Sequence, residues 1–190
     1  MDMAGERLIS APRQTVWEAL NNTEILKASI PGCETLQATS PTEMTATVAI
    51  KLGPISAKFA GRVHLSDIDP PNGYTLSGEG KGGPAGFAKG AAKVHLAEQP
   101  EGTLLTYTVE AQVGGRIAQL GARLIDATAK SMADQFFSRF VEQVMATMPQ
   151  AEAASPAPLP AAPKEKLNYG LLTLVAAAIA IAIAGWVILQ

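Results

Sequence analysis

The chain has 190 residues, a formal net charge of −2 and 47% hydrophobic residues. Acidic and basic side chains are interspersed along most of it, so the basic stripe of a nucleic-acid-binding protein is not expected. Cys33 is the only cysteine, which excludes an internal disulfide, and two histidines are too few for a histidine-rich metal site. The first ten residues lack the long apolar run of a signal peptide.

The N-terminal part predicts one strand followed by two short helices. Residues 4–10 have the pattern of a strand. Pro12 is typical of a helix start because its missing N–H would be unpaired there, and we expect a helix over 12–21. Thr23 can cap a second helix over 24–29.

Five segments then alternate apolar and polar residues. Their ranges are 43–52, 55–65, 74–80, 87–96 and 103–113. This alternation gives each strand one buried and one solvated face, as in an antiparallel sheet. Glycine- and proline-containing turns separate several of the strands, as expected for a meander.

A long helix is expected from Gly114 to about Met145. This stretch contains no proline, and its apolar stripe winds around the helix, so a flat partner could not bury it. A curved sheet could. The predicted fold class is therefore α+β, with a curved antiparallel sheet around a long C-terminal helix, in a domain spanning residues 1–148.

Two further segments are expected after this domain. Residues 149–168 are rich in proline and alanine and predict a semi-rigid linker. Within 169–190, the 19 residues 171–189 carry no charge, about the length needed to cross a bilayer. Lys164 and Lys166 precede this run, so the positive-inside rule predicts a single-pass tail anchor with a cytoplasmic N-terminal domain. The alternative is a buried helix of a soluble protein.

The inward-facing positions of the sheet include many small residues, which favours an apolar cavity under the helix. The residues expected to line it are Val48, Phe59, Leu76, Ala92, Val94, Tyr107, Val109, Ala111, Leu120, Leu124, Thr128 and Met132. The alternative is that the backbones simply approach more closely and leave no space.

No pattern of catalytic residues stands out. His64 and His95 fall on the solvated faces of their strands, and the sequence marks no carboxylate as a partner for either. The glycine-rich segment 78–90 lacks the Gly-Lys-Ser/Thr of a phosphate-binding loop. We therefore expect neither a catalytic nor a metal site.

The element order resembles the START-like (SRPBCC) superfamily, whose helix-grip fold wraps an antiparallel sheet around a C-terminal helix. More specifically, four stretches resemble the family of the G subunit of carbon monoxide dehydrogenase. They are 30–34 (IPGCE), 52–61 (LGPISAKFAG), the glycine-rich 78–91, and 114–140 (GGRIAQLGARLIDATAKSMADQFFSRF). The last stretch is the most specific of the four.

The resemblance implies a non-enzymatic accessory protein that recruits a molybdenum hydroxylase, typically CO dehydrogenase, to the cell inner membrane. It also implies an apolar ligand, for which respiratory quinone fits the electron-transfer context, and no covalent cofactor. One alternative is a pure anchor or assembly factor without ligand. Another is a START-like enzyme such as a cyclase or dehydratase, for which Tyr74 and Tyr107 are the inward polar residues available.

Overall fold

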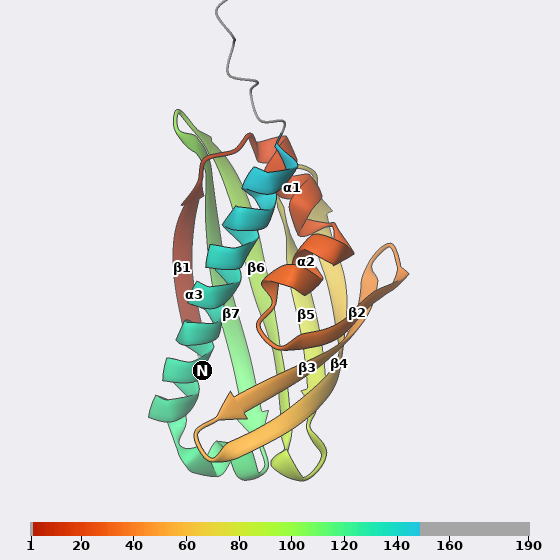
Figure 1. Ribbon diagram of the computed structural model, residues 1–190, viewed down its shortest axis with the longest axis vertical. Helices are drawn as coiled ribbons and strands as arrows, with labels where there is room; N and C mark the ends of the chain where they lie inside the picture. Colours follow the sequence, from red (N-terminus) through yellow and green to blue (C-terminus); the bar gives the residue numbers. More distant parts are fainter. Residues whose placement is uncertain (1, 149–190) are drawn as a thin grey trace, which may run out of the picture. The chain divides into compact units, whose positions relative to one another are not determined.

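The computed structural model describes residues 2–148, which form one seven-stranded antiparallel sheet and three α-helices (Figure 1). The strands are β1 (Asp2–Ile9), β2 (Cys33–Ser40), β3 (Glu43–Leu52), β4 (Ile55–Asp69), β5 (Gly73–Lys81), β6 (Phe87–Gln99) and β7 (Gly102–Gly114). The α-helices are α1 (Arg13–Leu20), α2 (Thr23–Ser29) and α3 (Ala122–Thr147), and the 3-10 turns are η1 (Gly83–Ala85) and η2 (Arg116–Leu120).

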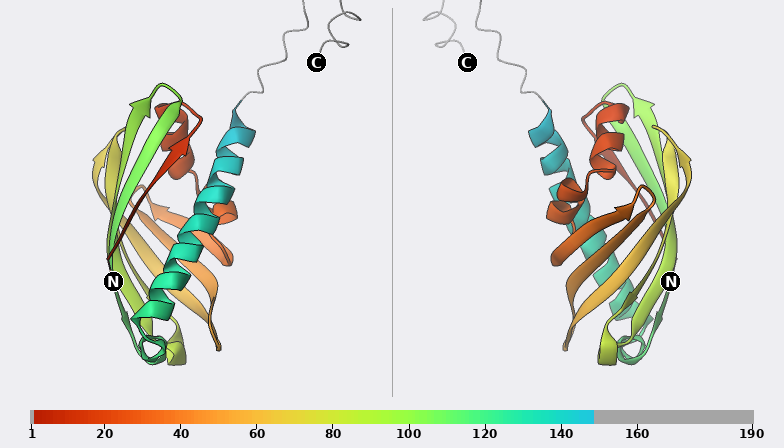
Figure 2. Two further views of the ribbon diagram at one scale, coloured as in Figure 1. Left: turned by 90° about the vertical axis from the view of Figure 1, so that its left-hand side faces the viewer. Right: turned by 90° about the vertical axis from the view of Figure 1, so that its right-hand side faces the viewer.

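The sheet is a meander from β2 to β7, and β1 joins it beside β7. The strand order is β1-β7-β6-β5-β4-β3-β2, so β1 and β2 form the two edges. Figure 2 shows that the sheet is curved and that the helices lie on its inner side, with α3 running across it. The α+β class and the curved antiparallel sheet predicted from the sequence are therefore confirmed.

Two local predictions near the N-terminus need correction. The cap of α2 is Asn22, whose side-chain oxygen accepts hydrogen bonds from the N–H groups of Glu24 and Ile25 at 2.9 and 3.2 Å. Thr23 is instead the first helical residue. Strand β2 was not predicted, because its sequence CETLQATS has little apolar alternation, and only its pairing with β3 makes it a strand.

The single long helix predicted from Gly114 is wrong at its start. Gly114 still belongs to β7, a 3-10 turn comes next, and α3 begins only at Ala122. Gly115 and Gly121 flank this turn with φ of 83° and 85°, a left-handed conformation that glycine adopts readily. At 26 residues, α3 is about 39 Å long.

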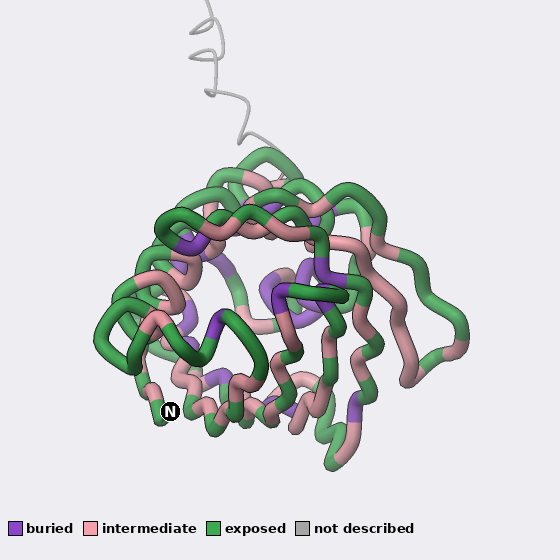
Figure 3. Tube along the Cα trace, turned by 90° about the horizontal axis from the view of Figure 1, so that it is seen from below, coloured by how far each residue is buried: buried purple, intermediate pink, exposed green. Residues whose placement is uncertain are grey.

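Buried apolar residues gather in two separate clusters. The larger, which we call the upper cluster, packs α1, α2 and the second half of α3 against the sheet; its members include Ile9, Val16, Trp17, Leu96, Leu105, Phe137, Phe140 and Val144. The smaller, the lower cluster, consists of Leu52, Phe59, Ala85 and Ile117. The strands between them carry mainly partly buried inner residues, visible in Figure 3 as pink alternating with green.

The predicted linker (149–168) and tail anchor (169–190) lie outside the described residues. No helix within residues 2–148 has both the length and the apolar character that a membrane crossing requires.

Candidate functional site between the sheet and helix α3

The inner face of the sheet carries two adjacent cross-strand rows of small residues between the two clusters. One row is Met44–Val63–Gly78–Gly90–Ala111, and the next is Ala46–Gly61–Gly80–Ala88–Val113. Seven of these ten positions are glycine or alanine. Side chains of this size do not extend far from a sheet, so this band contributes little filling beneath α3.

Close packing of the strands explains two of these glycines. A Cβ atom on Gly61 would lie 2.8 Å from the carbonyl oxygen of Glu79, and one on Gly90 would lie 2.4 Å from that of Glu110. Both positions require glycine whether or not a cavity exists. At Gly78 such a Cβ would also be tight, 3.1 Å from the carbonyl oxygen of Arg62, whereas at Gly80 the nearest atoms are 3.9 Å away, so a methyl group would fit there in ordinary contact. Close approach of neighbouring backbones therefore explains only some of the small residues in this band.

The twelve residues predicted to line a cavity divide between the two clusters and a set that belongs to neither. Phe59 belongs to the lower cluster and Leu120 packs against it, while Leu76, Val94 and Tyr107 pack against the upper cluster. Residues in neither cluster, all partly buried, are Val48, Ala92, Val109, Ala111, Thr128 and Met132. These six residues therefore belong to neither apolar cluster, and two of them, Thr128 and Met132, line a hollow.

Leu124 does not line the space between the sheet and α3 as the sequence predicted. Its side chain is 37% exposed and lies near the β3–β4 turn, since a Cβ on Gly53 would be 3.3 Å from Leu124 Cδ2. The neighbouring Ile125 is the partly buried residue. The prediction assumed one continuous α-helix, whereas the 3-10 turn winds at about three residues per turn and changes the phase of the helix after it.

A hollow of about 400 Å³ opens beside this band, between α3, the end of β3 and the loop before β2. Its lining includes Ile50 from the sheet, Gly32 from the loop, and Thr128 and Met132 from α3. Two of the predicted lining residues, Thr128 and Met132, therefore line a hollow beside α3.

Polar groups on the inner side gather where β1 faces α3. Arg7 of β1 forms an ion pair with Asp134 of α3, and its guanidinium carbon lies 5.6 Å from the centre of the Phe137 ring. Tyr107 also stacks on Phe137, with ring centres 5.1 Å apart. The Tyr107 hydroxyl reaches over Gly5, where a Cβ would lie 2.5 Å from it. These groups border the upper end of the band.

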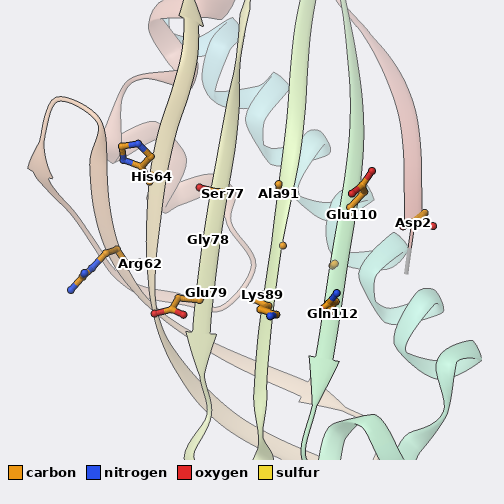
Figure 4. Close-up of a pocket in the computed structure, with 12 residues that line it drawn as sticks. Asp2, Arg62, His64, Ser77, Gly78, Glu79, Lys89, Ala91, Glu110 and Gln112 are labelled. Atoms are coloured by element: carbon orange, nitrogen blue, oxygen red, sulfur yellow. The ribbon is translucent and has the colours of Figure 1, made fainter.

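A second, larger hollow of about 670 Å³ lies on the outer face of the sheet (Figure 4). Figure 4 shows Arg62, Glu79, Lys89 and Gln112 in one line across four strands. His64, also at this hollow, lies 4.0 Å from the Glu43 carboxylate. Charges of both signs line an open surface here, so this hollow is a poor match for an apolar ligand despite its size.

Burial disfavours the charged forms of Tyr74 and Cys33. Burial raises the pKa of Tyr74 to about 12, and its ring makes an edge contact with Trp17 at 5.7 Å. Burial also raises the pKa of Cys33, against the opposing charge of Lys27, so the thiol is not activated as a nucleophile. Residues 2–148 hold no cluster of metal-ligating side chains.

Comparison with known proteins decides the family. Residues 5–145 match the family model described as the G subunit of carbon monoxide dehydrogenase (CoxG). The chain belongs to the CoxG family. The search of curated proteins found no match.

Solved structures confirm the START-like (SRPBCC) fold of this CoxG-family chain. A conserved protein from Geobacillus kaustophilus is 29% identical with a TM-score of 0.73, covering 77% of this chain and 96% of that one. TTHA0849 from Thermus thermophilus is 16% identical with a TM-score of 0.60, covering 78% and 100%. A protein from Rhizobium leguminosarum is 22% identical with a TM-score of 0.58, covering 75% and 95%. At these lower identities, the last two show the fold alone.

The Arg7–Asp134 pair was missed by the sequence interpretation. The alternation along β1 places Arg7 on the same face as the buried Ile9, which was the available signal. With side chains 39% and 50% exposed, the pair lies at the seam between β1 and α3.

Proposed function

We propose that this CoxG-family protein is a non-enzymatic accessory protein of a CO dehydrogenase-type molybdenum hydroxylase. It holds an apolar ligand, respiratory quinone in this proposal, between the sheet and α3. Its C-terminal tail attaches it to the cytoplasmic face of the cell inner membrane. Membership of the CoxG family supports the link to the CO dehydrogenase system, since residues 5–145 match that family model.

The observation that carries the ligand proposal is a group of partly buried apolar residues on the inner side of the domain that belongs to neither apolar cluster. Ala92, Val109 and Ala111 of the sheet and Met132 of α3 are apolar, partly buried and outside both clusters. Water against such a surface is unfavourable, by about 25 cal/mol for each Å² left exposed. A flat apolar molecule placed there would bury this surface and complete the core.

A titration with decylubiquinone tests the ligand proposal. Residues 1–148 can be used alone, because the Geobacillus kaustophilus structure is almost wholly covered by the matching domain. Quenching of the fluorescence of Trp17, the tryptophan of this domain, should saturate at one equivalent. A linear response without saturation, equal to that of free tryptophan, would contradict a bound quinone.

The quinone titration needs a matched pair of variants. Ala92 faces α3, whereas Ala91, the preceding residue of β6, is exposed on the outer face and lines the outer hollow. Ala92→Phe should abolish saturable binding, and Ala91→Phe should leave it unchanged. The reverse result would move the ligand to the outer face of the sheet.

The anchoring part of the proposal rests on the uncharged run 171–189 and the preceding lysines. Deleting everything after Pro149 should leave a folded domain that still binds its hydroxylase. In intact cells, the hydroxylase should then move from the membrane fraction to the soluble fraction. An unchanged distribution would show that this protein is not the anchor.

The absence of catalysis is also proposed. Tyr74 and Tyr107 were the candidates for an enzyme of the cyclase or dehydratase type. A phenol with a pKa of about 12, as at Tyr74, exchanges protons poorly near neutral pH. Tyr107 is stacked on Phe137, and the nearby Asp134 is already paired with Arg7. This arrangement suits holding a ligand better than acid–base chemistry.

A further inference from the structure

Three segments come together at the end of the domain where α3 begins. They are the β3–β4 turn (51–55), the β5–β6 loop with its flanks (81–89), and the connection from β7 into α3 (112–126). Figures 1 and 2 both show them at the lower end of the molecule, opposite the end of α3. We call these three segments the basic tip, because lysine and arginine dominate their charged residues.

The charges at this tip are strongly unbalanced. Its residues include five cations, Lys51, Lys81, Lys89, Arg116 and Arg123, and one carboxylate, Asp126. All five cations are exposed, and none forms an ion pair within residues 2–148, although Glu79 of β5 lies opposite Lys89 of β6 on the outer face. Neighbouring cations left unpaired create a positive potential that attracts anions.

The opposite end of the sheet carries the reverse charge. The β4–β5 turn (66–73) and the β6–β7 turn (97–103) together contain four carboxylates, Asp67, Asp69, Glu98 and Glu101, and no lysine or arginine. Glu98 pairs with Arg13 at 3.7 Å. A domain with a net charge near zero is therefore polarised along its length, with the positive end at the basic tip.

The tip also exposes apolar side chains among its cations. Phe87 is 46% exposed and Leu124 is 37% exposed, and Pro54 and Pro84 are exposed as well. Large apolar residues beside lysine and arginine are the composition of surfaces that settle into the boundary between lipid headgroups and acyl chains. An acidic protein surface would match the cations but would gain less from the exposed aromatic ring.

The three segments of the basic tip pack against one another through buried residues. Ala85 and Ile117 are buried in the lower cluster with Leu52. The β5–β6 loop packs directly on the start of the α3 connection, since a Cβ on Gly86 would lie 2.0 Å from the carbonyl oxygen of Gly114. The cations and Phe87 are thus presented on a rigid platform, which lowers the entropic cost of binding.

We infer that the basic tip is a contact surface for a membrane of anionic phospholipids, separate from the attachment proposed for the tail. The inference does not depend on quinone binding, because it rests on charge and exposed apolar surface alone.

Vesicle sedimentation tests this inference with residues 1–148, which lack the proposed anchor. Vesicles of phosphatidylcholine alone are compared with vesicles in which roughly a third of the lipid is phosphatidylglycerol, enough to give a strongly negative surface. The domain should bind the anionic vesicles and not the neutral ones, and the binding should weaken as salt is added, because salt screens surface charge. No binding to the anionic vesicles, or equal binding to both, would overturn the inference.

Paired charge variants locate the contact. The double variant Arg116→Gln with Arg123→Gln should weaken binding to anionic vesicles by roughly 30-fold, given the typical contribution of each basic residue near such a surface. Phe87→Ser should weaken it further. The matched control removes two exposed cations elsewhere, Lys27→Gln with Lys93→Gln, and should retain most of the binding.

Equal losses in both double variants would show a diffuse charge effect and overturn the assignment to the tip. The decylubiquinone titration of the Arg116→Gln/Arg123→Gln variant separates this inference from the proposed function. Lost vesicle binding with intact quinone binding supports the membrane contact by itself. Unchanged vesicle binding by this variant would refute the basic tip as the membrane contact, whatever the result of the quinone titration.

Discussion

Replacing Ala92 with phenylalanine should raise the stability of the ligand-free domain. The side chain at this position faces α3, with Leu76 and Val109 as its cross-strand neighbours. Full burial of a phenylalanine contributes about 1.5–3 kcal/mol relative to exposure, and this partly buried site should recover about half of that. We therefore expect a gain of about 1 kcal/mol, or about 3 °C in Tm for a domain of this size.

The assay is urea unfolding of the delipidated domain, followed by circular dichroism, with Ala91→Phe as control. Ala91 lies on the outer face, so its replacement should change stability by no more than about 0.5 kcal/mol. In a filled core, Ala92→Phe would instead overpack and cost about 1–3 kcal/mol. A loss in that range, with Ala91→Phe neutral, would refute the cavity.

Three further predictions rest on burial and charge. Phe140→Ala, at a fully buried position of the upper cluster, should cost about 3–5 kcal/mol in urea unfolding, and a cost below about 1 kcal/mol would disprove the packing described for α3. Leu124→Asp should change the free energy of unfolding by no more than about 1 kcal/mol, because Leu124 is 37% exposed. Loss of folded protein would show instead that Leu124 faces the sheet, as the sequence predicted. Burial raises the pKa of Tyr74 from its usual 10 to about 12, so the unfolded chain releases this proton first as the pH rises. Stability present below pH 10 should therefore fall between about pH 10 and 12, by about 2–3 kcal/mol, and Tyr74→Phe should lack that part of the decline, as urea unfolding across this range would show.

Most of the fold could be predicted because the strands carry their pattern in local sequence. The alternation in residues 43–52 matches β3 (Glu43–Leu52) at both ends, since each side chain faces either α3 or solvent. Strand β2 could not be predicted in this way. It is an edge strand with few apolar residues, and it depends on backbone pairing with β3, which no local pattern encodes.

The start of α3 and the pairing of inner polar groups were also difficult to predict, because no local sequence pattern encodes them. Gly115 and Gly121 are compatible with a helix pattern, and only their positive φ angles show that a 3-10 turn precedes α3. That turn changed the phase, so Ile125 replaces Leu124 as the partly buried residue. The partnership of Arg7 with Asp134 joins positions 127 residues apart, and neither residue signals the other in sequence.

The most direct test of the proposed function is native mass spectrometry of residues 1–148 purified from cells that contain the respiratory membrane. The proposal predicts the mass of the domain plus one apolar molecule with the mass of a quinone, released on denaturation. The adduct should persist in Ala91→Phe and be absent from Ala92→Phe. The bare domain mass in all three proteins, after purification without detergent, would contradict a ligand between the sheet and α3.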